Sequence, residues 1–310
     1  MQYYQWLKQW LTDYVQPSVK LKTYYHYQDM IKLHINPHLG QYPLKSINSM
    51  RIQKMVNSLL QSGNKKNNHG LSTNTINAIL SIVKNSLKMA HQLGYFHQFK
   101  NITFKRPKSI EKPVTCFHFN EQKQIENAIL LQKRTSLYGV IFCLYLGLRI
   151  GELLALEWED IDLQTKELVV RKTCYEGKNH FGKFQRMVVS PKTQSSIRQI
   201  PLPKQLLPLF LQLKKQSHSS YVLSSKNKPI SIRSYQRSFQ NLLIQLKIKQ
   251  RGFHALRHTF ATRALECGMD IKTLSEILGH SNSSITLNRY VHSLFKHKQE
   301  MMNHLGNLLK

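Results

Sequence analysis

Side chains suited to phosphate chemistry gather within 37 residues, in the segment that runs from His254 to Tyr290. His254 and Arg257 are three residues apart, and His280 follows a glycine. An imidazole transfers protons near neutral pH, a guanidinium holds an anion through paired hydrogen bonds, and a phenol can attack as a nucleophile. The segment therefore predicts chemistry on a phosphoryl group.

Two more candidate site residues, both cationic, precede this segment. Arg149 lies in the sequence Gly-Leu-Arg-Ile-Gly-Glu, directly after a strongly apolar stretch in which solubility does not call for a charge. Lys192 lies in a short polar break between two alternating stretches, which places it at the tip of an expected hairpin. Glu152 ends the first of these sequences and is expected to orient or neutralise the neighbouring cations.

The charge of the chain indicates a polyanionic partner. Lys and Arg number 45 against 16 Asp and Glu, a net charge of +29, and residues 1–112 carry +13 while residues 113–310 carry +16. Both halves are therefore expected to contact the same polymer. Double-stranded DNA fits better than a membrane, because no basic amphipathic segment stands apart and no apolar run approaches the ~18 residues of a membrane-spanning helix.

The cysteines and the N-terminus indicate a cytoplasmic protein. The four cysteines lie far apart, with no Cys-x-x-Cys pair, so neither a disulfide framework nor a zinc ribbon is predicted. The first residues lack the charged and then apolar regions of an export signal. We therefore expect a cytoplasmic protein with reduced thiols.

Tyr290 is the candidate nucleophile, because it is the only tyrosine close in sequence to the histidine cluster. Breaking a DNA strand without metal or ATP requires a nucleophile, fixed cations on the phosphate and an acid for the departing 5′ oxygen. A free phenol titrates near ~10, so it needs a neighbouring base or cationic surroundings at neutral pH. His254 or His280 can provide that base.

Arg149 and Arg257 suit the two non-bridging oxygens of the phosphate, because a guanidinium donates in a fixed fork where an ammonium offers a point charge. Lys192 is the candidate proton donor to the leaving oxygen. His254 and His258 have a spacing that could face a metal, but His-Glu-x-x-His and a nearby third ligand are both missing from the sequence. We therefore predict no metal site and no cofactor, and a structural role for His258.

Hydrophobic periodicity predicts a mainly helical chain with a small antiparallel sheet. The first hundred residues form a helical bundle in which Asn48 or Ser49 caps one helix and Gly63 ends it. In the second half Asn120 is expected to cap a helix, and Asp270 to cap a short helix that ends at Gly279. Three alternating stretches predict strands of one sheet, at residues 167–175, 186–190 and 196–202.

These patterns divide the chain at a basic segment with two prolines. The predicted parts are a helical domain at residues 1–100, a linker at 101–114, a second domain at 115–292 and a tail at 293–310. The apolar residues of the tail fall near one helical face, which needs something to cover it. Six cations are candidates for contacts with the DNA backbone: Lys65, Lys66, Lys84, Lys88, Lys105 and Arg106.

The site residues together resemble the signature of the tyrosine recombinases, the integrase family of phages and mobile elements. The matching features, in the family's order, are Arg149 in Gly-Leu-Arg-Ile-Gly-Glu, Lys192 in a strand-turn-strand, His254-x-x-Arg257, Gly279-His280 and Tyr290 ten residues later. The resemblance covers nearly the whole chain. It implies a helical SAM-like domain that binds the core site, followed by a catalytic domain with the small sheet.

The resemblance also implies an activity. The arginines and histidines would surround the phosphate, Lys192 would act as the general acid, and Tyr290 would form a 3′-phosphotyrosine link, so that strands are cleaved and rejoined without metal or ATP. Similar recombinases dock a C-terminal tail onto the adjacent protomer of a tetramer on two DNA sites. The expected partners are thus duplex DNA, three further copies of the chain, and an accessory DNA-bending or directionality protein.

Two other functions fit parts of the pattern. A type IB topoisomerase-like enzyme shares the chemistry but relaxes supercoils as a monomer, and the apolar face of the tail argues against it. A DNA-binding regulator could share the fold without the chemistry, but the complete set of candidate catalytic residues argues against it.

Overall fold

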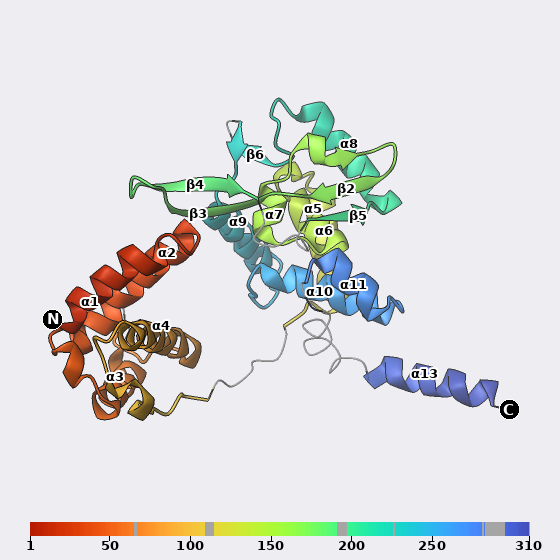
Figure 1. Cartoon of the computed structure of the whole chain (residues 1–310). Coiled ribbons are helices and arrows are strands. Elements are labelled where there is room, and N and C mark those ends of the chain that lie inside the picture. Colours follow the sequence, from red (N-terminus) through yellow and green to blue (C-terminus); the bar gives the residue numbers. More distant parts are fainter. Residues whose placement is uncertain are drawn as a thin grey trace. The chain divides into compact units, whose positions relative to one another are not determined.

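The computed structural model of the chain describes residues 1–64, 67–108, 115–190, 197–225, 227–280, 282 and 295–309. It divides the chain into two compact units, one of Met1–Lys112 with Gly177–Phe184 and one of Pro113–Glu176 with Gln185–Lys310 (Figure 1). Both units are mainly helical, and the strands pair in small antiparallel sheets. The predicted fold class is confirmed.

The first unit is a helical bundle. Its elements are α1 (Tyr3–Trp10), which continues into η1 (Leu11–Val15), α2 (Leu21–Met30), which continues into η2 (Ile31–Gly40), η3 (Leu44–Ser46), α3 (Ser49–Ser62), α4 (Thr73–Gln92) and η4 (Gln98–Asn101). The Asn48 side chain accepts a hydrogen bond from the Arg51 amide, and Gly63 is the C-cap of α3, so both predicted ends of this helix are confirmed.

Three of the four aromatic residues of α1, Tyr3, Trp6 and Trp10, lie in the core of this unit, and the fourth, Tyr4, is exposed. Tyr3 and Trp6 are fully buried against α4, where the Tyr3 hydroxyl lies 2.8 Å from that of Ser86 and the Trp6 indole donates to the Ser86 carbonyl at 3.0 Å. Trp10 stacks on Tyr27 with ring centroids 6.3 Å apart. Burying such rings supplies much of the apolar area that stabilises a small bundle.

The second unit begins with a group of helices that precedes the sheet. Its elements up to the sheet are α5 (Phe119–Leu131), η5 (Thr135–Leu137), α6 (Tyr138–Leu146), α7 (Ile150–Leu154) and η6 (Trp158–Asp160). The strands are β1 (Ile161–Asp162), β2 (Glu167–Val170), β3 (Thr173–Lys178), β4 (Phe184–Val189) and β5 (Arg198–Pro201). Then follow η8 (Lys204–Leu206), α8 (Leu207–Gln216), β6 (Ser224–Ser225), β7 (Lys228–Pro229), α9 (Ile232–Gln245), α10 (His254–Glu266), α11 (Ile271–Leu278) and α13 (Phe295–Leu308).

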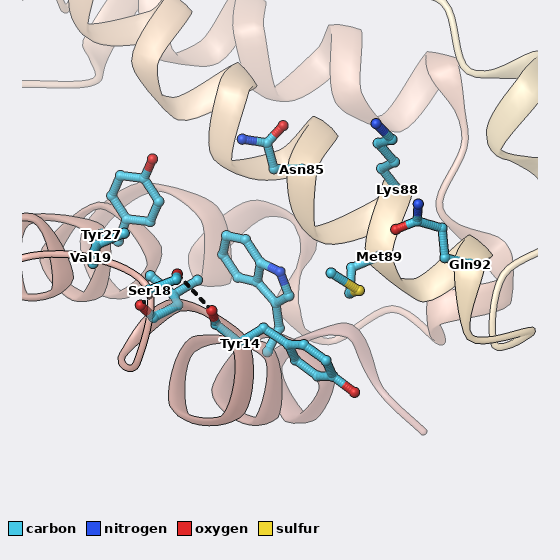
Figure 2. Close-up of a pocket in the computed structure, with 10 residues that line it drawn as sticks. Tyr14, Ser18, Val19, Tyr27, Asn85, Lys88, Met89 and Gln92 are labelled. Carbon is cyan, nitrogen blue, oxygen red and sulfur yellow. Dashed lines mark hydrogen bonds between the residues drawn. The ribbon is translucent and has the colours of Figure 1, made fainter.

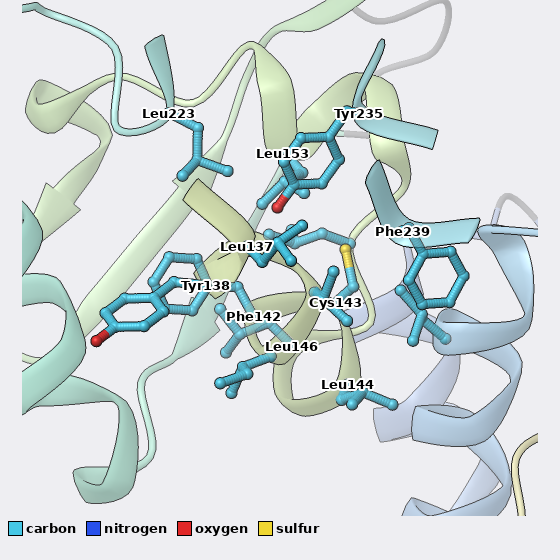
Figure 3. Packing of buried hydrophobic residues seen from close by; sticks show 14 of the residues in the cluster. Leu137, Tyr138, Phe142, Cys143, Leu144, Leu146, Leu153, Leu223, Tyr235 and Phe239 are labelled. Atoms are coloured by element: carbon cyan, nitrogen blue, oxygen red, sulfur yellow. The ribbon is translucent and has the colours of Figure 1, made fainter. Parts of the chain in front are cut away.

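Helix α6 is the centre of this unit's core. It is apolar around its whole circumference, which is typical of a helix buried on all sides. Leu153 of α7 and Tyr235 and Phe239 of α9 surround it (Figure 3), and Phe142 stacks on Phe210 of α8 with ring centroids 4.1 Å apart. This packing fixes the end of α6, directly before the loop that carries Arg149.

The prediction that these strands form one sheet was wrong. The stretch expected as one strand, residues 167–175, is divided into β2, which pairs with β1 and β5, and β3, which pairs with β4. The division falls at Arg171 and Lys172, whose side chains bind acidic groups of η6 and its N-cap. Arg171 pairs with Asp160 of η6, and the Lys172 ammonium lies 2.5 Å from a carboxylate oxygen of Glu157, the N-cap. Side chains held in this way interrupt the alternation of a continuous strand.

The start of α5 also differs from the prediction. Its N-cap is His118 rather than Asn120, and the His118 amide donates to the Glu121 carboxylate at 2.8 Å. An acidic residue three positions into a helix often fills this role, so the Glu121 carboxylate moves the start two residues earlier.

Candidate active site

Three arginines meet at the C-terminal end of α11. A helix leaves its last carbonyl groups without intrahelical partners, and its dipole favours cations there. Three guanidinium groups donate to three consecutive carbonyls at this end: Arg198 Nε to Ile277 at 2.5 Å, Arg257 to Leu278 at 2.6 Å and Arg149 to Gly279 at 3.2 Å. Arginines that lie 49 or more positions apart in the chain thus converge on one helix end.

Arg257 is the buried member of the group, with 2% of its surface exposed. It lies in the first turn of α10 and also donates to the Gly147 carbonyl at 2.7 Å, so it joins the end of α6 to the end of α11. One of its terminal nitrogens lies 3.0 Å from Nε2 of His280. The guanidinium is therefore held in one orientation by three partners.

Arg149 is the accessible member, with 36% of its side chain exposed. It is the N-cap of α7, where its amide donates to the Glu152 carboxylate at 2.9 Å and its guanidinium to the other oxygen at 2.6 Å. The backbone reaches this position through Gly147, whose φ of +64° suits a glycine. The start of α7 thus presents Arg149 with each of its terminal nitrogens bound to a protein acceptor, one to Glu152 and one to the Gly279 carbonyl.

Glu152 lies between Arg149 and Arg198 and is 5% exposed. Arg198 donates to both of its oxygens, at 3.2 and 2.8 Å. Burial would raise the pKa of this carboxyl, but hydrogen bonds and charge from Arg198, with the charge of Arg149, outweigh burial and lower the pKa to about 2. The carboxylate therefore offsets only part of the positive charge of the three arginines, and the site keeps an excess that attracts anions.

The histidines occupy two places. His280 follows α11 and contacts Arg257, as described above. His254 is the exposed first residue of α10, and its ring lies edge-on to that of His258 with centroids 4.4 Å apart. His258 is buried, which is the position expected of a structural residue.

Of the remaining predicted residues, two lie on α4. Lys192, Tyr290, Lys65 and Lys66 lie outside the described residues. Lys84 and Lys88 are exposed on α4, and Lys88 borders a hollow of about 320 Å³ with Trp10 and Tyr27 (Figure 2).

The predicted linker contains the last two candidates for DNA contact, Lys105 and Arg106, both exposed. The backbone around them is attached to the first unit, because the Lys105 amide donates to Gln53 and the Pro107 carbonyl accepts from Asn77. The predicted linker boundaries stay a prediction.

Sequence reasoning missed Arg198. Arg198 is not among the predicted site residues, yet it is 8% exposed and contacts two elements of the site. The signal was available in the pattern of β5, in which Arg198 and Ile200 both point inward. A charge at an inward position of a strand needs a buried partner.

Two features are absent from the described part of the chain. No three His, Cys, Asp or Glu side chains there form a group that could hold a metal ion. No helix there is both long and apolar enough to cross a membrane.

Comparison with known proteins places the chain in a family. The model of the phage integrase family matches residues 117–297, and the model of the phage integrase N-terminal SAM-like domain matches residues 2–60. A XerC-like tyrosine recombinase of Caldanaerobacter subterraneus is 31% identical and aligns over 96% of this chain and 81% of its own length. The ICEBs1 integrase of Bacillus subtilis is 28% identical over 92% of this chain and 78% of its own.

Solved structures share the fold. The Tn1549 transposon integrase, in complex with a circular intermediate DNA, has a TM-score of 0.80 at 23% identity, covering 98% of this chain and 99% of its own. A lambda integrase tetramer bound to a Holliday junction has a TM-score of 0.70 at 19% identity, covering 94% of this chain and 77% of its own. Because the first family model spans more than half of the chain, and a relative above 30% identity aligns along nearly all of it, the chain belongs to the phage integrase family of tyrosine recombinases.

Proposed function

We propose that the chain is a site-specific DNA recombinase of a mobile element, which cleaves and rejoins DNA strands through a 3′-phosphotyrosine intermediate on Tyr290. The observation that carries the proposal is the convergence of Arg149, Arg257 and His280 on the end of α11. Fixed cations and imidazoles at one point are what a phosphodiester needs when its oxygens gain charge in the transition state.

Each residue has a role in this reaction. The Tyr290 oxygen bonds to phosphorus, the 5′ oxygen leaves with a proton from Lys192, and His254 or His280 accepts the phenolic proton. Arg149 and Arg257 hold the non-bridging oxygens. Rejoining reverses the step with a 5′ hydroxyl as the nucleophile, and the phosphotyrosine bond conserves the energy of the broken phosphodiester.

Orientation distinguishes the two arginines. Arg257 is fixed by the Gly147 and Leu278 carbonyls, so it supplies a charge whose position costs no reorganisation during the reaction. Arg149 is more exposed, so its guanidinium is the more accessible of the two to incoming DNA.

The assembly we propose is a tetramer on two DNA sites in the bacterial cytoplasm, assisted by an accessory DNA-bending or directionality protein. Both halves of the chain are basic, which supports contact with duplex DNA along both. Lambda integrase, which has the same fold, forms a tetramer on a Holliday junction. Helix α13 exposes Met302, Leu305 and Leu308, a surface that docking on a neighbouring protomer would cover.

Trapping of the covalent intermediate tests the proposal. Duplexes that bind the chain are first selected from a randomised library, and the selected site is then made with a nick, so that the short 5′ product diffuses away after cleavage. We expect a protein–DNA adduct that survives denaturant with the wild type and with Tyr95→Phe, an exposed tyrosine in the first unit, but not with Tyr290→Phe. No adduct with the wild type would refute the recombinase proposal, and an adduct with Tyr290→Phe would refute Tyr290 as the nucleophile.

A further inference from the structure

We propose that Arg198 is a positioning residue for strand cleavage, which holds the end of α11 in place and controls how strongly Glu152 binds Arg149. The inference rests on the proposed function, because it concerns the rate of that reaction. Arg198 does not touch the DNA: its side chain is 5% exposed, and its partners are protein groups.

The strand register fixes where Arg198 lies. It is the first residue of β5 and pairs with Val170 of β2, so the sheet determines the position of its Cα. The side chain crosses to two helices: Nε donates to the Ile277 carbonyl at 2.5 Å, and the two terminal nitrogens donate to the two oxygens of Glu152. Only a planar fork can satisfy a carboxylate and a carbonyl in this way.

Gly279 shows how closely the end of α11 packs on this side chain. A Cβ at Gly279 would lie 3.0 Å from Cδ of Arg198 and 3.1 Å from one of its terminal nitrogens. The φ of +65° at Gly279 turns the chain out of the helix, so that His280 reaches Arg257. The turn at Gly279 therefore packs directly against the Arg198 side chain.

Arg198 has a second effect in addition to packing against Gly279, which it exerts through the carboxylate of Glu152. Glu152 divides its hydrogen bonds between Arg198 and Arg149, both within 3.2 Å. When Arg198 is removed, the charge of Glu152 is directed more strongly at Arg149, which then has less charge available for the phosphate. Arg198 thus acts on catalysis without contact with the reacting atoms.

Two measurements test both effects of Arg198. One is the rate of single-turnover cleavage of the nicked duplex at saturating protein, and the other is the dissociation constant for the same duplex. We expect Arg198→Met to slow cleavage about 100-fold, the order of loss that misplaced groups cause, and to leave the dissociation constant within about twofold. The matched control is Arg171→Met, which also removes an arginine from a buried carboxylate, that of Asp160, but its described partners lie in η6 and not in α11. It should cleave at the wild-type rate.

A double variant separates positioning from general loss of structure. If Arg198 and Glu152 act as one unit, then Arg198→Met with Glu152→Gln cleaves no more slowly than Arg198→Met alone, because the unbalanced carboxylate is gone. Glutamine can still accept the Arg149 amide, so the start of α7 is kept. Losses that multiply in the double variant, or a wild-type rate in Arg198→Met, would overturn the inference.

Arg198→Lys covers the case in which Arg198→Met does not fold. Lysine keeps the charge but cannot bind Glu152 and Ile277 in the same geometry, so cleavage should fall more than tenfold, and a wild-type rate would again overturn the inference. A wild-type chain that forms no adduct would instead refute the proposed function, so the two failures are distinguishable.

Discussion

At the scale of single residues, the buried guanidinium of Arg257 shows how the site keeps its shape without substrate. Its donors are bound to the Gly147 and Leu278 carbonyls and lie next to His280, so the side chain cannot adopt other rotamers without leaving buried acceptors unpaired. The orientation is set by folding and not by DNA. This arrangement predicts that shape, and not only charge, matters at this position.

Arg257→Lys is therefore expected to be damaging. An ammonium cannot bridge the two carbonyls and the histidine, and we expect single-turnover cleavage to fall about 100-fold or more while duplex binding changes little. The control is Arg233→Lys, at an exposed arginine of α9. Cleavage within a few fold of the wild type by Arg257→Lys would contradict the assigned role.

The pKa of Glu152 makes a prediction about stability. The pKa is lowered from 4.5 to about 2, so the ionised group stabilises the fold above its unfolded pKa and loses that contribution as the pH falls through the folded value. At about 1.4 kcal/mol per pKa unit, the difference in unfolding free energy between wild type and Glu152→Gln should shrink by about 3 kcal/mol from pH 6 to pH 2. Urea unfolding at a series of pH values measures this, and a constant difference would contradict it.

At the scale of elements, the turn after α11 carries a prediction with a close control. Gly279→Ala and Gly268→Ala both force a left-handed backbone on alanine, which costs about 1–2 kcal/mol, but a Cβ at Gly268 meets no atom within 4 Å. Only Gly279→Ala also displaces Arg198. Urea unfolding should show a larger loss for Gly279→Ala, and cleavage should fall at least tenfold for it alone. Equal effects on cleavage would contradict the packing argument.

Local signals predicted the elements whose ends are set by nearby residues. Asp270 does cap α11, because its side chain accepts from the Thr273 amide, and Gly279 does end it, because only glycine adopts that φ easily. The division of residues 167–175 was not predictable in this way, since it depends on Arg171 and Lys172 binding acidic partners in η6 and at its N-cap. Pairing between segments is not visible in periodicity.

The contacts between the site residues were likewise not predictable from local sequence signals. Arg149 and Arg257 were identifiable by residue type and by resemblance, but nothing local shows that both would bind carbonyls of one helix end. Arg198 was passed over because its partners, Glu152 and Ile277, lie 46 and 79 positions away. Its inward position on β5 was the one local sign.

At the scale of the whole molecule, the charge of +29 is spread over both halves, so DNA binding should depend steeply on salt. Each phosphate neutralised contributes about −0.9 to the slope of log K against log salt concentration. Fluorescence anisotropy from 50 to 200 mM salt should therefore show a loss of affinity of about a thousandfold or more. A loss below tenfold would mean that most of these cations do not contact phosphates.

The exposed leucines of α13 lead to a prediction about assembly. Leu305 and Leu308 of α13 are 48% and 81% exposed, and in the tetramer we propose a neighbouring protomer would cover them. Leu305→Glu with Leu308→Glu should keep duplex binding within about twofold but lower strand exchange between two sites at least tenfold, because burying an unpaired carboxylate opposes docking. Asn303→Glu with Asn307→Glu adds the same charge to exposed polar positions of α13 and serves as the control. Sedimentation of the protein–DNA complexes should show tetramers with the wild type and the control, and full strand exchange by the leucine variant would mean that this surface has no role in assembly.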